Sequence, residues 1–133
     1  MLYLIGTGLY NEKDLSLRSL DAIKKCELVY LESYTNKVNF DVKDMEKLIG
    51  KKIIAVGREM LENDMEDFVK KAGSKDVALL IIGDPLMATT HMAIVLEARK
   101  NGIDVRIIHN ASVLNAIGDT GLSLYNFGKI ASI

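Results

Sequence analysis

The chain has 133 residues, of which 49% are hydrophobic and 26% are charged, and its formal net charge is -1. This size and composition are typical of one globular domain that buries a core of its own. Because the chain has no excess of basic residues to neutralise phosphates, we expect neither nucleic acid nor an anionic membrane surface as a partner.

The compartment and the domain count follow from what the sequence lacks. Cys26 is the single cysteine, so no internal disulfide can form and a reducing cytoplasm is the expected location. The N-terminus enters "MLYLIGTG" without a basic leader, and we therefore expect no signal peptide. The longest apolar run, residues 77–82, is shorter than a membrane span. Repeats, low-complexity stretches and Pro/Ser linkers are not apparent, which indicates a single domain over residues 1–133.

Apolar runs of strand length alternate with helix-like segments along the chain. The runs lie at residues 2–5, 28–31, 53–56, 77–82 and 105–108. The first two helices are indicated by apolar residues at helical spacing. These residues are Leu17, Leu20 and Ile23 in the first, and Met45, Leu48 and Ile49 in the second, which ends at Gly50.

Three more helices are predicted further along the chain. Met65, Phe68, Val69 and Ala72 share one helical face, with Asn63 and Glu66 spaced as a capping box and Gly73 as the stop. The acidic residues of "ENDMED" fit a solvated helix start. A further helix is expected to open at Thr89 or Thr90 and to close at Asn101-Gly102. A short helix over residues 113–117 is expected to be capped by Ser112, and a final strand to follow in "GKIASI".

Continuous apolar strands joined by helices predict a fold class. The pattern is that of a Rossmann-like α/β domain, with a mainly parallel five-stranded sheet and helices on both faces. In such sheets, ligands bind at the carboxyl ends of the strands. The first, fourth and fifth strands should therefore bring their terminal loops, at residues 6–10, 83–87 and 109–113, to one edge.

The first of these loops has two competing interpretations. Gly6-x-Gly8 followed by Glu32 at the end of the second strand is similar to a dinucleotide-binding fingerprint. The third glycine of that fingerprint would fall at position 11, which is Asn11, and the helix starts late, near Asp14. A tight turn without cofactor contact also explains the two glycines. No P-loop pattern is present.

The loop Gly83-Asp84-Pro85 contains the only proline of the chain. Glycine permits close backbone approach, while proline fixes its own φ and biases Asp84 toward an extended conformation. A rigid loop of this kind can present one carboxylate and backbone N–H groups to a small molecule. The alternative is an ordinary turn with Asp84 solvated.

The remaining polar candidates have ordinary structural explanations. Ser112, Thr89 and Thr90 fit helix caps as well as they fit ligand contacts. His91 and His109 have no partners at metal-ligand spacing, so we expect no metal site. No Ser-His-Asp or Cys-His arrangement stands out.

Three segments together resemble the diphthine synthase family of the tetrapyrrole methylase superfamily. They are "LYLIGTGLYNEKDLSLRSLDAIKKCELVYLESYT", "VALLIIGDPLMATTH" and "VRIIHNASVLNAIGDTGLSLYNFGK". The resemblance covers essentially the whole chain, and the combination of GDPLxATTH, IHNAS and GLxLYxFGK is highly specific. Thr7 departs from the apolar residue common between the two glycines, and Met87 occupies a variable apolar position.

The resemblance implies a methyltransferase that uses S-adenosylmethionine. Its acceptor is the amino group of a modified histidine on translation elongation factor 2, in diphthamide biosynthesis, and the family forms homodimers. By position, the resemblance assigns cofactor binding to Leu9, Asp84, Met87, Ser112 and Val113, with Gly6, Gly8, Gly83 and Pro85 shaping the loops. An amine reacts only when deprotonated, yet no general base is evident in the sequence.

The resemblance also implies a second domain, because family members continue into one and hold the cofactor in the cleft between the two. We therefore expect residues 1–133 to form an N-terminal domain that carries part of the cofactor site, and that is inactive alone. Two alternatives stay open: a non-catalytic small-molecule-binding or interaction module, and a superfamily methylase with another substrate. A fragment lacking its neighbouring domain should expose apolar surface and self-associate.

Overall fold

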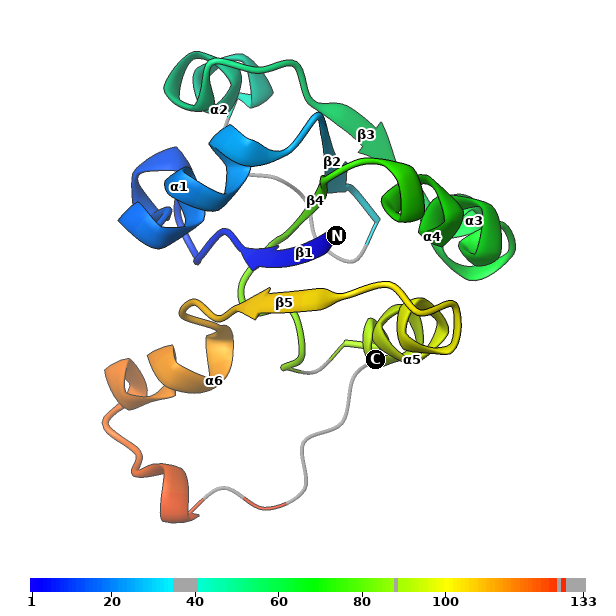
Figure 1. Ribbon diagram of the computed structural model, residues 1–133. Helices are drawn as coiled ribbons and strands as arrows, with labels where there is room; N and C mark the ends of the chain where they lie inside the picture. Colours follow the sequence, from blue (N-terminus) through cyan, green and yellow to red (C-terminus); the bar gives the residue numbers. More distant parts are fainter. Residues whose placement is uncertain (35–40, 88, 127, 129–133) are drawn as a thin grey trace.

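The computed structural model describes residues 1–34, 41–87, 89–126 and 128 and shows a parallel sheet between two layers of helices (Figure 1). The strands are β1 (Leu2–Gly6), β2 (Leu28–Glu32), β3 (Ile54–Val56), β4 (Val77–Ile81) and β5 (Val105–Ile108). The α-helices are α1 (Leu17–Lys25), α2 (Val42–Ile49), α3 (Arg58–Glu62), α4 (Met65–Ser74), α5 (Met92–Lys100) and α6 (Val113–Ala116). The described residues also form the 3₁₀ turns η1 (Glu12–Asp14), η2 (Ile117–Thr120) and η3 (Leu124–Asn126).

The five strands pair in the order β3-β2-β4-β1-β5, and every pair is parallel. All the carboxyl ends therefore lie at one edge, and β4, β1 and β5 are neighbours there. This confirms the predicted fold class and the predicted meeting of the first, fourth and fifth strand ends. The three central strands β2, β4 and β1 are almost wholly buried, as expected of a parallel sheet covered on both faces. The edge strands β3 and β5 are partly exposed.

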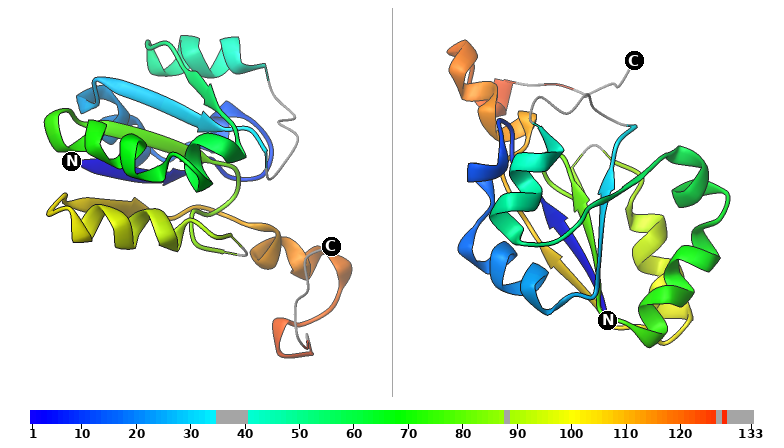
Figure 2. Two further views of the ribbon diagram at one scale, coloured as in Figure 1. Left: turned by 90° about the vertical axis from the view of Figure 1, so that its right-hand side faces the viewer. Right: turned by 90° about the horizontal axis from the view of Figure 1, so that it is seen from above.

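Alternate strand residues pack into two cores, one on each face of the sheet. Figure 2 shows the helices that cover these two faces. On one face Tyr3, Ile5 and Leu80 pack against α1 and α2. On the other face Leu4, Leu79 and Ile81 pack against α3, α4 and α5. Burial of this much apolar surface is the main force that holds the sheet in place.

The first two helices form where they were predicted, but their buried faces differ from the prediction. Leu17 is 81% exposed, and α1 instead buries Ser19, Ala22 and Ile23. A three-residue step falls roughly 60° short of a full helical turn, so residues at i, i+3 and i+6 drift off one face. The same drift leaves Leu48 half-exposed in α2.

The start and the end of α4 differ from the prediction. Asn63 does not cap α4, because it has a helical conformation and is the C-cap of the preceding helix α3, which the sequence analysis missed. The cap position of α4 is Asp64, with no side-chain hydrogen bond. Gly73 does not stop the helix, since it lacks a positive φ and α4 continues through Ser74.

The fifth helix also starts later than predicted. α5 begins at Met92 with His91 at the cap position, and it closes at Asn101-Gly102 as expected. Thr89 does not cap it, because its hydroxyl donates to the Pro85 carbonyl at 2.7 Å. Nor does Thr90 cap it with its side chain; its carbonyl accepts from the Ala93 N–H.

Replacing Gly73 and Gly50 with alanine should change stability in opposite directions. Gly73 is helical, and an added Cβ would lie no closer than 3.7 Å to Ile103, so Gly73→Ala should stabilise the fold by about 0.5–1 kcal/mol. Gly50 ends α2 with φ at +68°, so Gly50→Ala should destabilise it by about 1 kcal/mol although the space is open. Urea unfolding of both variants tests this, and shifts of the same sign would contradict it.

None of the helices in the described ranges is both long and apolar enough to cross a lipid bilayer. The final strand predicted in "GKIASI" lies almost wholly outside the described residues, so the structure does not test it.

Candidate functional site

The loops that follow β1 and β4 are joined backbone to backbone at the carboxyl edge of the sheet. Gly8 and Gly83 form an isolated antiparallel bridge. The Gly83 N–H donates to the Gly8 carbonyl at 2.9 Å, and the Gly8 N–H donates back to the Gly83 carbonyl at 3.3 Å. Both residues have φ near +80°, which favours glycine over residues with a Cβ. The two glycines therefore hold the two loops together.

Gly6 is needed for a different reason, which is lack of space. A Cβ at this position would lie 2.5 Å from the Gly83 carbonyl oxygen, 2.8 Å from the Cβ of Asn110 and 3.1 Å from the Pro85 ring. Residues from all three loops thus converge on one backbone position. The tight-turn interpretation does not explain Gly6, because its close contacts are with the other two loops. It does fit Gly8, where a Cβ would lie 2.5 Å from the Cβ of Asp14 in the same loop.

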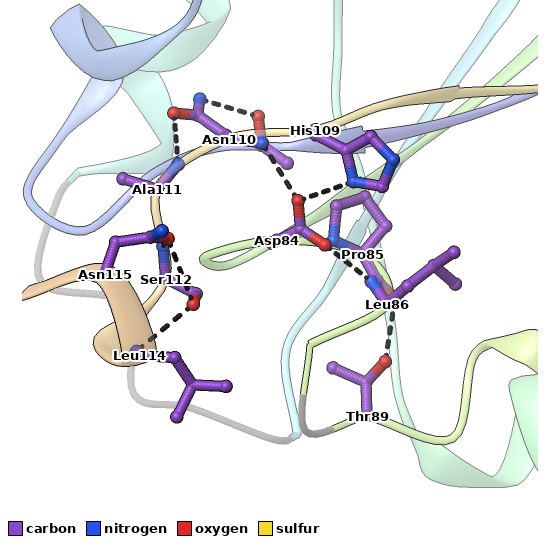
Figure 3. Close-up of polar contacts among 11 residues, drawn as sticks. Asp84, Pro85, Leu86, Thr89, His109, Asn110, Ala111, Ser112, Leu114 and Asn115 are labelled. Carbon is purple, nitrogen blue, oxygen red and sulfur yellow. Dashed lines mark hydrogen bonds and ion pairs between the residues drawn. The ribbon is translucent and has the colours of Figure 1, made fainter. Parts of the chain in front are cut away.

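The carboxylate of Asp84 connects the β4 loop to the β5 loop (Figure 3). Its Oδ1 accepts from the Leu86 N–H at 2.9 Å. Its Oδ2 accepts from the Asn110 N–H at 3.1 Å and lies 2.8 Å from His109 Nδ1. Asp84 is only 4% exposed, so the interpretation of an ordinary turn with a solvated acid is wrong.

The electrostatics of Asp84 agree with this role. Burial pushes the pKa of its carboxyl up, but the hydrogen bonds from Leu86, His109 and Asn110 outweigh burial and hold that pKa below the ordinary value of 3.8. The carboxylate is therefore charged at neutral pH and both of its oxygens have partners within the protein. What Asp84 does directly in this structure is to fix the relative position of two loops.

Asn110 and Asp14 complete the framework, and the sequence analysis did not identify either as a site residue. The Asn110 side-chain amide donates to the Gly6 carbonyl at 3.0 Å and to the Asp14 carbonyl at 2.9 Å. The Asp14 carboxylate in turn accepts from the N–H groups of Leu9 and Tyr10. The sequence signals were the place of Asn110 in the IHNAS segment after the fifth strand and the place of Asp14 in the loop after the first strand.

Ser112 is buried and caps α6, as predicted. Its Oγ accepts from the Leu114 N–H at 3.2 Å, and its own N–H donates to Asn115 Oδ1 at 2.9 Å, which completes a capping box. The hydroxyl is thus engaged in holding the β5 loop, like the carboxylate of Asp84 in the β4 loop.

The apolar candidates behave differently from the polar ones. Met87 is 43% exposed, Val113 is 66% exposed and Leu9 is half-buried. These three side chains come from the β4, β5 and β1 loops, so the carboxyl edge presents apolar groups on a rigid backbone frame. A groove of about 590 Å³ between α1 and β5 lies on the flank of the sheet and contains none of the candidate residues.

The geometry does not support the dinucleotide fingerprint. Glu32 is fully buried and accepts from the Tyr34 N–H at 2.7 Å, so it is not presented to a ribose. The Gly-x-Gly turn leads into η1, and α1 begins only at Leu17 with Ser16 as its cap. The pyrophosphate-binding helix start of that fingerprint is therefore displaced from the turn.

Comparisons of the sequence and of the structure with known proteins agree on one family. The sequence model of the family described as "Tetrapyrrole (Corrin/Porphyrin) Methylases" matches residues 1–133. The chain is 49% identical to "Diphthine methyl ester synthase" of Schizosaccharomyces pombe and 45% identical to the human protein of that name, over 133 residues in each case. Both alignments cover 100% of this chain and 47% of the relative.

A solved structure described as "Crystal structure of diphthine synthase" is similar with a TM-score of 0.91 and 42% sequence identity. The alignment covers 96% of this chain and 52% of that one. The chain thus spans about half the length of the curated relatives it matches. The predicted resemblance to the diphthine synthase family is confirmed.

Proposed function

Because this chain belongs to the tetrapyrrole (corrin/porphyrin) methylase family, we propose that it contributes the first domain of a methyltransferase of the diphthine synthase type. We propose S-adenosylmethionine as the methyl donor. The observation that supports this most is the frame of three loops that the Gly8–Gly83 bridge, Asp84 and Asn110 hold at the carboxyl edge of the sheet.

The residues at this edge fit such a cofactor. The faces of the adenine ring and the carbon chain of methionine are apolar, and Leu9, Met87 and Val113 offer partly exposed apolar contacts at the ends of three different strands. The loop backbones pack closely at Gly6, Gly8, Gly83 and Pro85. The side chains of Asp84 and Ser112 hold the loops at fixed positions. Preorganised loops bind a ligand with less loss of conformational entropy.

Bound S-adenosylmethionine supplies a methyl group that its sulfonium already activates. The task of the protein is then to align the acceptor with that methyl group and to exclude water. In this chain the rigid frame performs the alignment on the cofactor side. A second domain, closing over the carboxyl edge, would supply the remainder of the cleft.

For the acceptor we propose the modified histidine of translation elongation factor 2. Its amino group is the acceptor that the resemblance implies. The relatives from S. pombe and human are named for a methyl ester. An ester forms on a carboxylate oxygen, so a carboxylate of the same side chain is a second proposed acceptor. We also propose a cytoplasmic homodimer.

Titration with S-adenosylhomocysteine, the demethylated cofactor, tests the donor. We expect calorimetry to show saturable binding to the protein with its second domain, and markedly weaker binding to residues 1–133 alone. Mass spectrometry of elongation factor 2 after incubation tests the acceptor, with methyl groups on the modified histidine as the expected result. Mild alkali should remove a methyl ester but not an N-methyl group. No binding by either form would leave the non-catalytic interaction module as the better hypothesis.

A further inference from the structure

The groove of about 590 Å³ between α1 and β5 shares no residue with the candidate cofactor site and has no part in the proposed function. One wall is a single face of α1, with residues at positions i, i+3, i+4 and i+7: Arg18, Asp21, Ala22 and Lys25. The floor is formed by Tyr3 of β1 and by the end of β5.

β5 is only partly covered on the side of the sheet where α1 lies. The register of the sheet pairs Tyr3 with Arg106, and it pairs Ile5 with Ile108, so the members of each pair point to the same face. Tyr3 and Ile5 are buried, whereas Arg106 is exposed and Ile108 is only partly buried. α1 and α2 therefore cover β1 on this face and leave β5 open. Because a parallel sheet is normally covered on both faces, this position lacks one helix.

The charges around the groove favour an acidic partner. Arg18, Lys25 and Arg106 are exposed, and none of them makes an ion pair with another residue of the described ranges. Asp21 is the one acid among the lining residues. The groove is thus basic although the formal net charge of the chain is -1, and complementary charge selects partners at interfaces.

The shape of the groove favours a helix over a small molecule. A small ligand is mostly enclosed by its pocket, but the four charged side chains of this groove are all exposed. Its apolar surface is a strip formed by Tyr3, Ala22 and Ile108, beside α1 and over the open part of the sheet. An amphipathic helix that lies beside α1 would cover this strip with its apolar face.

We propose that this groove binds an acidic amphipathic helix of a partner protein, whose carboxylates pair with Arg18, Lys25 and Arg106. A second copy of this chain fits less well. In a two-fold symmetric dimer, the same surface meets itself, so the three cations of one groove would face those of the other, and like charges repel. The proposal does not require the methyltransferase function.

Fluorescence anisotropy with a labelled synthetic peptide tests the proposal, in the absence of S-adenosylmethionine. The peptide is longer than about 15 residues, so that it can form a helix in water, with Leu along one helical face and Glu on both sides of it. We expect saturable binding that weakens as the ionic strength rises from about 0.1 M to about 1 M, because the Debye length falls from about 10 Å to about 3 Å. A peptide with Lys in place of each Glu should bind at least about tenfold more weakly.

Variants of the protein locate the peptide. Arg18→Glu should still fold, because an acid in the first turn of α1 suits the helix dipole. It should weaken binding of the acidic peptide about three- to tenfold, whereas Asp21→Asn should tighten it about twofold. Arg99→Glu makes the same change as Arg18→Glu at an exposed position of α5, on the opposite face of the sheet, and should leave the affinity unchanged. In NMR spectra, the methyl signals of Ala22 and Ile108 should shift as the peptide binds.

Several results would overturn the proposal. One is no saturable binding of the acidic peptide to the wild-type protein, and another is equal affinity for the Lys peptide. Equal affinity of folded Arg18→Glu and Arg99→Glu would place the peptide elsewhere. A peptide of the same composition with scattered Leu residues should bind more weakly; equal binding would indicate a general surface for polyanions, nucleic acid included.

Other occupants of the groove give results of their own. If residues 1–133 bind the peptide and the protein with its second domain does not, then that domain covers the groove and no separate partner does. If the peptide dissociates a dimer in sedimentation experiments, then a second copy occupies the groove. Either result overturns the proposal of a partner helix and leaves the proposed methyltransferase function untouched.

Discussion

Gly6→Ala should destabilise the protein by at least about 1–3 kcal/mol, the usual cost of forcing extra atoms into a packed site. The new Cβ would lie 2.5 Å from the carbonyl oxygen of Gly83. A backbone oxygen cannot turn away as a flexible side chain can, so the β4 loop must move as a whole. That movement stretches the Gly8–Gly83 bridge and the hydrogen bond from Asn110 to the Gly6 carbonyl. We therefore expect weaker binding of S-adenosylhomocysteine as well.

Gly118→Ala is the matched control for this prediction. Gly118 lies in η2 with open space around it and without a positive φ, so the same substitution should change stability by less than about 0.5 kcal/mol. Urea unfolding of both variants measures the difference. Equal unfolding midpoints for Gly6→Ala and the wild-type protein would show that the loops are not tightly packed against Gly6.

The sequence predicted the sheet because the signals for a parallel sheet are local. Runs such as residues 77–82 are apolar throughout, and the periodicity between them changes to that of helices. The edge at which three strands end then follows from the parallel order alone. Helix boundaries were less predictable, since Asn63 fits an N-cap of α4 and a C-terminal residue of α3 equally well until the two helices are placed.

The side-chain partners at the site could not be predicted, because they are remote in the sequence. Asn110 contacts Gly6 across 104 positions, and Asp84 contacts His109 across 25. The sequence showed an acid beside a proline at a strand end, which is a chemical signal. It did not show that the acid points inward. His91 was considered only as a metal ligand and rejected, and its burial could not be predicted because it depends on how α5 packs against the sheet.

Asp84→Asn should weaken binding of S-adenosylhomocysteine by roughly ten- to a hundredfold, because hydrogen bonds to a charged group are worth about 1.5–3 kcal/mol and each 1.4 kcal/mol is about tenfold in affinity. Asparagine can still accept from the Leu86 N–H through one oxygen. Its amide group, however, replaces the oxygen that accepts from the Asn110 N–H, which places two donors against each other. The β4 and β5 loops then lose their shared anchor.

The same substitution should change how stability depends on pH. Because the folded protein holds the pKa of Asp84 below its ordinary value of 3.8, the charged carboxylate stabilises the fold fully above that value. This contribution is lost as the pH falls below 3.8 through the lower folded-state pKa. In Asp84→Asn that part of the acid destabilisation should be absent. His109 is two-thirds exposed, so solvent screens its pairing with Asp84, and His109→Asn should cost less than Asp84→Asn.

Asp21→Asn makes the same chemical change on the exposed surface of α1. It should change neither the affinity for S-adenosylhomocysteine nor the loss of folding stability at acid pH. Calorimetric titrations well below the unfolding temperature, at which each variant is folded, separate affinity from stability. Urea unfolding between pH 3 and pH 7 gives the second readout. If Asp84→Asn binds S-adenosylhomocysteine as tightly as Asp21→Asn does, then the Asp84 bridge does not position the cofactor loops. If Asp84→Asn binds more weakly but loses stability at acid pH as the wild-type protein does, then the carboxylate contacts the cofactor directly.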